Sequence, residues 1–194
     1  MNSLIIAIIY GLSGFLMKFS DDEYDEKSNK IMASILAIIN GVLIGYLTSN
    51  IAEAPYIFLT IIIATGLALK INGIHHIFSL IVFIIVCFLF NFFSNQLFNL
   101  SLITLIICTF SAYIDEFGND NPKFQKNKFL KFFFDYRFTM RVAVLILSLF
   151  GIYSNLTGFT IPYIHFLNIE TFIFFLIFDL GYITAGEIFK KYFA

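Results

Sequence analysis

Long apolar runs alternate with short polar segments along almost the whole chain. Lipid offers no hydrogen bonds to a backbone, so runs of this length predict helices that cross a membrane. The runs lie at 3–17, 31–49, 55–69, 76–94, 98–114, 138–156 and 168–188. The pattern therefore predicts an all-α, polytopic membrane protein with seven transmembrane helices, arranged as one bundle over residues 1–194.

Lysine and arginine fall on one side of this arrangement. All twelve lie on the side reached after the first, third, fifth and seventh runs, and the other connections carry none. The positive-inside rule then places the N-terminus outside and the C-terminus in the cytoplasm, with cytoplasmic loops at 18–30 and 114–137. The expected location is the cell (plasma) membrane. The net charge of −1 gives no indication of a nucleic-acid partner.

Composition agrees with a membrane protein, because 59% of the residues are hydrophobic and 13% are charged. Gly41 and Gly45 have the four-residue spacing of small residues that lets helix backbones approach closely, and Gly11 and Gly14 are expected to serve the same purpose. We expect these glycines to pack helices inside the bundle in preference to forming a dimer interface. The sequence does not determine the oligomeric state.

The first acidic segment, residues 19–29 (FSDDEYDEKSN), follows the first apolar run directly. If the helix continues, Asp22, Asp25 and Asn29 share one face, and Asp21 lies four residues before Asp25. Like charges at this spacing repel, so a bound cation is expected. Mg²⁺ or Mn²⁺ suits such hard oxygen ligands, together with a substrate phosphate. The alternative is an acidic, solvated helix cap that tolerates the repulsion.

The second acidic segment, residues 113–120 (YIDEFGND), leaves the fifth run on the same predicted side. Asp115 and Asn119 are four residues apart, as are Glu116 and Asp120. Taken alone, the segment is typical of a helix end closed by a turn. Its position at the same depth as the first segment instead favours two carboxylate clusters that share divalent ions.

A basic stretch follows the second acidic segment. Its members are Lys123, Lys126, Lys128, Lys131, Arg137 and Arg141. Metal-loaded carboxylates with nearby lysine and arginine form a set of groups that can hold a diphosphate. Phenylalanine is interleaved with lysine between 124 and 138, so contact with anionic lipid headgroups is a further expected role of this stretch.

The pattern Asp22-x-x-Asp25-x-x-x-Asn29 resembles the first aspartate-rich motif of the UbiA superfamily of intramembrane prenyltransferases. In that family a second acidic motif follows four spans later on the same side, where residues 115–120 lie here. The chain departs from the family in having Asn29 in place of the last acid and in being shorter by two spans.

The resemblance implies Mg²⁺, or Mn²⁺, held against an isoprenoid diphosphate lipid. The implied metal ligands are Asp21, Asp22, Asp25, Asp115, Glu116 and Asp120. Of these, Asp22, Asp25 and Asp115 are the expected catalytic carboxylates. The expected substrate-binding cations are Lys18, Lys123, Lys126, Arg137 and Arg141.

Two further features carry candidate chemistry. Asp179 lies in the middle of the last run, where an acid is costly and marks either function or a structural hydrogen bond, and Glu187 follows two turns later, on a face predicted to look inward. His75 and His76 lie in the short cytoplasmic connection after Lys70, within reach of a metal or phosphate. A solvated interfacial pair is the favoured interpretation of these histidines.

Three functions agree with these patterns. The leading one is a Mg²⁺-dependent integral membrane enzyme that acts on an isoprenoid diphosphate at the cytoplasmic face. The second is a cation channel or transporter with an acidic cytoplasmic mouth and Asp179 on the ion path. The third is a non-catalytic membrane subunit whose acidic loops dock a basic partner.

Overall fold

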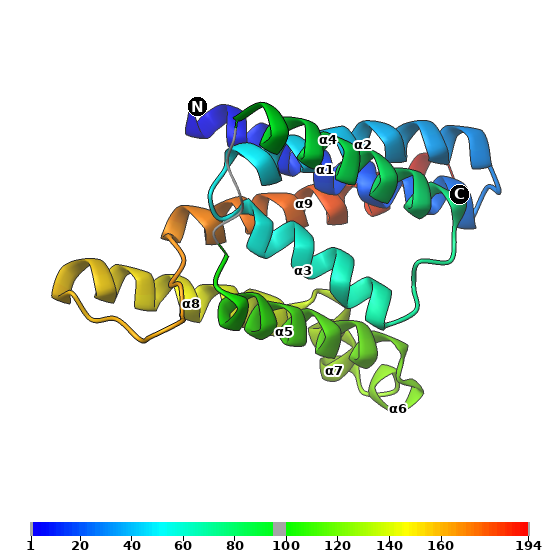
Figure 1. Ribbon diagram of the computed structural model, residues 1–194. Coiled ribbons are helices and arrows are strands. Elements are labelled where there is room, and N and C mark those ends of the chain that lie inside the picture. The colour runs from blue at the N-terminus through cyan, green and yellow to red at the C-terminus, as the bar shows by residue number, and fades with distance from the viewer. Residues whose placement is uncertain (1, 95–99, 194) are drawn as a thin grey trace. The chain divides into compact units, whose positions relative to one another are not determined.

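A computed structural model describes residues 2–94 and 100–193, and every regular element in those residues is a helix (Figure 1). The chain divides into two compact units. Unit 1 comprises Met1–Ala54, Ile71–Leu97 and Ile173–Ala194, and unit 2 comprises Pro55–Lys70 and Phe98–Phe172. The helices are α1 (Ser3–Asp25), α2 (Lys30–Asn50), α3 (Ala54–Leu67), α4 (Ile74–Ser94), α5 (Leu102–Asp120), α6 (Pro122–Gln125), α7 (Lys128–Asp135), α8 (Phe138–Thr157) and α9 (Ile169–Tyr192).

The described helices confirm the all-α class and include five that are long and apolar enough to cross a membrane, namely α1, α2, α4, α8 and α9. The predicted run at 55–69 forms α3, whose 14 residues reach about 21 Å at 1.5 Å per residue. The run at 98–114 forms α5 from Leu102 on, and its positions 98 and 99 lie outside the described residues. The count of seven spans and their orientation stay predictions.

Glycines on α2 hold this helix close to α4 in unit 1. A β-carbon added at Gly41 would lie 3.1 Å from the β-carbon of Val82, and one at Gly45 would lie 2.8 Å from that of Val86. Both distances are shorter than ordinary van der Waals contact. The structure therefore confirms that this small-residue pair packs two helices of the same chain against each other.

Backbone contact joins α1 to α9 in the same unit. A β-carbon at Gly14 would overlap the carbonyl group of Phe178, and one at Gly181 would overlap the carbonyl oxygen of Gly11. Because neither backbone carbonyl can rotate away as a side chain would, only glycine fits at these crossings. The predicted packing role of Gly11 and Gly14 is confirmed. This backbone contact fixes α1 against α9 at a point that precedes the acidic last turns of α1.

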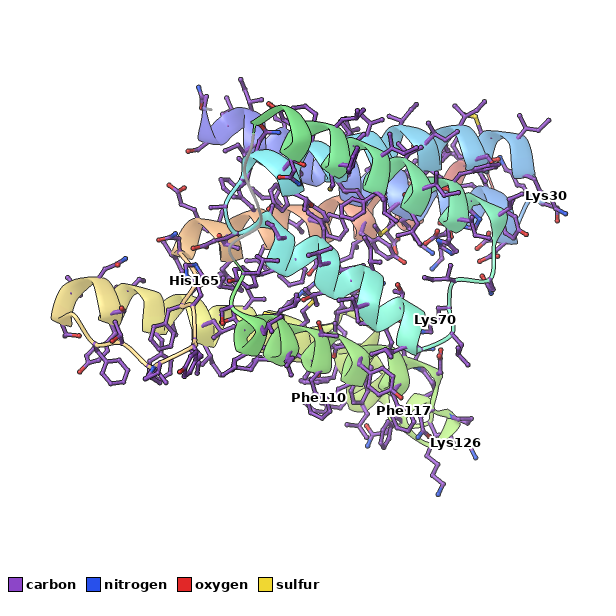
Figure 2. All side chains as sticks on the ribbon, in the orientation of Figure 1. Lys30, Lys70, Phe110, Phe117, Lys126 and His165 are labelled. Atoms are coloured by element: carbon purple, nitrogen blue, oxygen red, sulfur yellow. The ribbon has the colours of Figure 1, made fainter. Side chains whose placement is uncertain are left out.

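In unit 2, α5 packs against α8 and the short helices α6 and α7. The outer face of α5 is apolar, with Ile106, Phe110 and Phe117 exposed at spacings that keep them on one side of the helix. Phe110 and Phe117 project outward from α5 in Figure 2. An exposed apolar stripe along a helix is the surface expected to face lipid.

Candidate functional site

The first acidic segment forms the last turns of α1, which ends at Asp25. Ser28 then has a left-handed backbone (φ 55°), and Asn29 caps the start of α2 by accepting a hydrogen bond from the backbone N–H of Met32. The Asn29 side chain also donates to Glu23 at 3.0 Å. The prediction that Asn29 continues the acidic face of the first helix is therefore wrong, because the chain turns before reaching it.

Two carboxylates of this segment are buried and already paired with lysines one helical turn away. Asp22 Oδ1 lies 2.6 Å from Lys18 Nζ, and Glu23 Oε1 lies 3.3 Å from Lys27 Nζ. Part of the repulsion within the cluster is thus relieved by the helix's own cations. Three roles in this segment stay predictions: a metal ligand for Asp22, a catalytic role for Asp22 and Asp25, and a diphosphate contact for Lys18.

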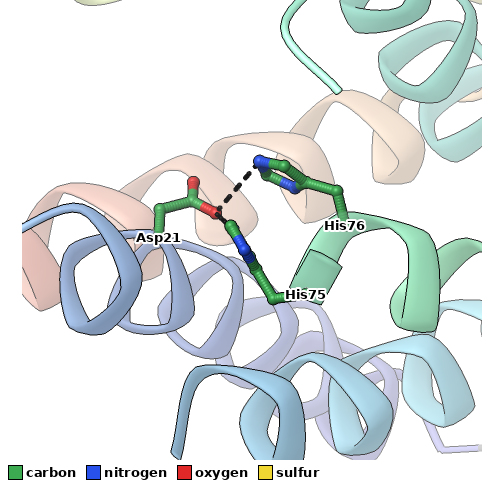
Figure 3. A group of neighbouring side chains, drawn as sticks. All are labelled: Asp21, His75 and His76. Atoms are coloured by element: carbon green, nitrogen blue, oxygen red, sulfur yellow. Dashed lines mark hydrogen bonds and ion pairs between the residues drawn. The ribbon is translucent and has the colours of Figure 1, made fainter. Parts of the chain in front are cut away.

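Asp21 faces the two histidines at the start of α4 (Figure 3). Its Oδ1 atom lies 3.2 Å from His75 Nε2 and 3.9 Å from His76 Nε2. Three potential ligand atoms, one from each side chain, all lie within 4.8 Å of one another, close enough together to contact one metal ion. His75 is 2% exposed, so its interpretation as a solvated interfacial residue is wrong.

His75 is buried because neighbouring residues leave a place for its ring. The rings of Tyr24 and His76 lie against it, with centroids 4.4 and 3.9 Å away. A β-carbon on Gly73 would overlap Cε1 and Nδ1 of the imidazole, so glycine at this position admits the ring. His75 Nδ1 is buried and has no hydrogen-bond partner among the described residues.

In the second acidic segment, Asp115 caps a different helix. Its carboxylate accepts hydrogen bonds from the backbone N–H groups of Thr139 at 3.0 Å and Met140 at 2.8 Å, in the first turn of α8. Arg137 occupies the N-cap position of α8 with a left-handed backbone and provides no side-chain cap. Burial raises the pKa of Asp115, although these hydrogen bonds act in the opposite direction.

Glu116 and Asp120 belong to a four-residue ionic network within unit 2. Lys70 Nζ lies 2.7 Å from Glu116 Oε2 and 3.0 Å from Asp120 Oδ1, and Arg137 Nη2 lies 3.3 Å from Glu116 Oε1. Burial alone acts to raise the pKa of Glu116, but Arg137 and Lys70 outweigh it and lower that pKa. Burial likewise acts to lower the pKa of Lys70, but Glu116 and Asp120 raise it.

The other predicted cations lie further along unit 2. Lys123 in α6 and Lys126 just after it are exposed, and Lys126 extends outward in Figure 2. The Arg141 guanidinium lies over the Phe138 ring, 5.4 Å from its centroid. None of these contacts tests whether Lys123, Lys126, Arg137 or Arg141 binds a diphosphate.

The two acids of α9 differ in burial. Asp179 is 4% exposed, whereas Glu187 is exposed. Eight residues turn an α-helix by about 80° beyond two full turns. The inward face predicted for both acids therefore contains Asp179 and not Glu187.

The sequence pattern did not join Asp21 to the two histidines, although it placed all three on the same side of the membrane. The two acidic segments belong to different units, so an ion shared between Asp115, Glu116 or Asp120 and the first segment stays a prediction.

Comparisons with protein-family models, curated proteins and solved structures find no match to this chain.

Proposed function

We propose that this protein is an integral membrane enzyme that acts on an isoprenoid diphosphate, with a divalent metal ion, at the cytoplasmic face of the cell membrane. One observation supports this most. Asp21, in the segment where metal ligands were predicted, lies with His75 and His76 in a group of ligand atoms within 4.8 Å. The group lies where an apolar helix ends, which is where a lipid headgroup would meet a soluble ion.

The proposal includes seven spans, with the N-terminus outside. The asymmetry of lysine and arginine supports the orientation. The apolar outer face of α5, with Ile106, Phe110 and Phe117 exposed, supports membrane contact along a helix that also carries the second acidic segment.

The residues at the end of α1 fit a divalent ion. Asp21 and Asp25 are four residues apart on α1 and supply hard oxygen ligands of the kind that Mg²⁺ and Mn²⁺ prefer. The two imidazoles beside Asp21 broaden the range of ions that the group accepts. When bound, the ion would neutralise charge on the departing diphosphate.

The chain's own residues would do the remaining work. Lysine and arginine bind the diphosphate oxygens, and the apolar helices keep water from the isoprenoid tail. In the transfer step, the bond between the isoprenoid carbon and the diphosphate oxygen breaks and its electron pair leaves with the diphosphate. A nucleophilic atom of the acceptor forms the new bond to that carbon and loses its proton, which the released diphosphate accepts. Of the lysines and arginines predicted to bind the diphosphate, Lys18 lies nearest to Asp21 in the sequence, and it contacts Asp22 near the end of α1.

A turnover assay tests the proposal. The full chain in lipid nanodiscs is supplied with farnesyl or geranylgeranyl diphosphate and a membrane lipid extract as the source of acceptor, and released diphosphate is measured. We expect release that requires a divalent ion and stops with a chelator. Asp21→Asn should lower turnover at least about 100-fold, since even indirect partners of a metal contribute 10–100-fold.

The matched control is Glu170→Gln, which removes one exposed carboxylate at the start of α9 and should leave turnover unchanged. Absence of metal-dependent release from a folded wild-type protein with either diphosphate would disprove the proposal. Equal loss of turnover in Asp21→Asn and Glu170→Gln would disprove the assigned site.

The buried Asp179 favours one alternative, a cation channel or transporter with this carboxylate on the ion path. Flux of cations into liposomes that survives Asp22→Ala but is abolished by Asp179→Asn would support transport. The enzyme predicts the reverse order, because Asp22 lies beside the diphosphate site and Asp179 lies in the tail region.

A further inference from the structure

We propose that Asp21, His75 and His76 form a transition-metal site that binds an ion such as Zn²⁺ in preference to Mg²⁺. The inference names the metal of the site described above and rests on the proposed function only for the role of that metal in catalysis. The binding itself rests on the geometry and chemistry of three side chains within unit 1.

The ligand set determines which ions fit. Two imidazole nitrogens and one carboxylate oxygen match the mixed nitrogen and oxygen coordination of Zn²⁺ and of other borderline metals. Mg²⁺ instead takes oxygen ligands almost throughout and keeps several waters. A site in which two of the three protein ligands are imidazoles therefore favours the transition metal.

The distances are close to those of a loaded site. Tetrahedral coordination with bonds of 2.0–2.1 Å places neighbouring ligand atoms about 3.4 Å apart. Asp21 Oδ1 lies 3.2 Å from His75 Nε2 and 3.9 Å from His76 Nε2, and the three ligand atoms all lie within 4.8 Å of one another (Figure 3). Side-chain rotations that shorten the longer separations would bring the atoms to tetrahedral spacing. Three protein ligands leave the fourth position for water or a phosphate oxygen.

The charges around the site favour a bound cation. The Asp21 carboxylate lies beside both imidazoles, Asp25 acts electrostatically on His76, and the C-terminal end of α1 adds partial negative charge. Neutral imidazoles are the form that binds metal.

The His75 ring is fixed inside the protein with one nitrogen directed at the site. Its Nε2 atom faces Asp21, whereas Nδ1 is buried without a hydrogen-bond partner among the described residues. The other two side chains are partly exposed, with 21% for Asp21 and 32% for His76. An ion can therefore reach the group from solvent while His75 anchors it from inside.

Gly73 provides a way to disturb the site without removing a ligand. A β-carbon there would overlap the His75 imidazole, and it would also come within 3.2 Å of the Tyr24 ring. Gly73→Ala should therefore displace the His75 ring from its observed position beside Asp21. If the three side chains bind an ion together, this change should weaken binding although all three ligands remain.

Direct metal binding tests the inference. The full chain is purified in detergent, stripped with a chelator, and titrated with Zn²⁺ against a chromophoric chelator and with Co²⁺ followed by its visible spectrum. We expect one ion per chain, a Co²⁺ spectrum typical of mixed nitrogen and oxygen ligands, and no displacement by millimolar Mg²⁺. His76→Gln, at a partly exposed position, should weaken binding at least about 100-fold, and Gly73→Ala should weaken it as well.

The control is His165→Gln, which removes an exposed histidine in unit 2 and should leave binding unchanged. The inference is overturned if the folded wild-type chain fails to bind Zn²⁺ and Co²⁺, if Mg²⁺ displaces them, or if His76→Gln binds as wild type does. Diphosphate release without Zn²⁺ binding would refute this inference and leave the proposed function standing. Zn²⁺ binding without release would do the reverse.

Discussion

Replacing Asp115 by alanine tests whether this carboxylate is a structural cap, a metal ligand, or both. The side chain is 1% exposed and accepts two hydrogen bonds from the first turn of α8, from the backbone N–H groups of Thr139 and Met140. The N-cap residue of that helix, Arg137, provides no cap of its own. In the alanine variant both N–H groups lose their acceptor.

The expected loss of stability follows from these two bonds. A hydrogen bond to a charged group contributes about 1.5–3 kcal/mol. Burial, which raises the pKa of Asp115, also removes its carboxylate from water, and this desolvation offsets part of that gain. We therefore expect Asp115→Ala to lower the free energy of unfolding by about 2–4 kcal/mol. For a chain of this size, that corresponds to a fall in Tm of about 4–16 °C.

The assay is thermal unfolding in detergent, followed by helical circular dichroism with a metal chelator present. The matched control is Asp120→Ala on the same helix, whose carboxylate is 59% exposed and whose ion pair with Lys70 should contribute less than about 1 kcal/mol. If Asp115→Ala unfolds at the wild-type temperature in chelator, or no earlier than Asp120→Ala, the capping argument is wrong. Loss of stability only when metal is present would identify Asp115 as a ligand.

Three further predictions test packing, charge and topology. Gly181→Ala should destabilise the fold by at least about 1–3 kcal/mol, because its β-carbon overlaps the backbone of α1. The β-carbon of Gly186→Ala instead meets the flexible Lys18 side chain at 3.1 Å and is only in ordinary contact with Asp22, so equal unfolding temperatures of the two variants would contradict the argument. Although burial acts to raise it, the pKa of Glu116 is lowered, because Arg137 and Lys70 outweigh the effect of burial. The stability that ionised Glu116 adds to the fold is therefore complete at neutral pH and is lost as the pH falls below 4.5. Glu116→Gln should flatten that pH dependence of unfolding, and an unchanged acid limb would exclude this ion network as its source. Single cysteines placed in 18–30 and 114–137 should be labelled from the cytoplasm, and labelling from opposite sides would rule out both the topology and the enzyme.

The sequence by itself determined where the long apolar helices lie, whereas the short helices α6 and α7 fall in the stretch predicted as the loop 114–137. Each predicted apolar run falls on a helix in the described residues, because the length of an uninterrupted apolar run is a local property. Close helix packing at Gly41 and Gly11 was also predictable, because small residues at helical spacing let two backbones approach. That the partner helices are α4 and α9 was decided by the structure.

Helix ends were less predictable, because capping competes with continuation. The segment after Lys18 contains several carboxylates, a serine and an asparagine. These residues are compatible with a longer helix, and they also occur in turns and at helix caps. The structure ends α1 at Asp25 and uses Asn29 to cap α2. That choice depends on the angle at which the two helices pack, which no local pattern contains.

Only the tertiary structure decided which charged groups meet. His75 reaches Asp21 across 54 positions of sequence, and Lys70 reaches Glu116 across 46. A list of acids on one side of a membrane does not say which of them lie beside a lysine, a helix N-terminus or a pair of imidazoles. Those partners determine whether a carboxylate is neutralised or open to a metal, because electrostatic interactions act through distance in space and not through separation along the chain.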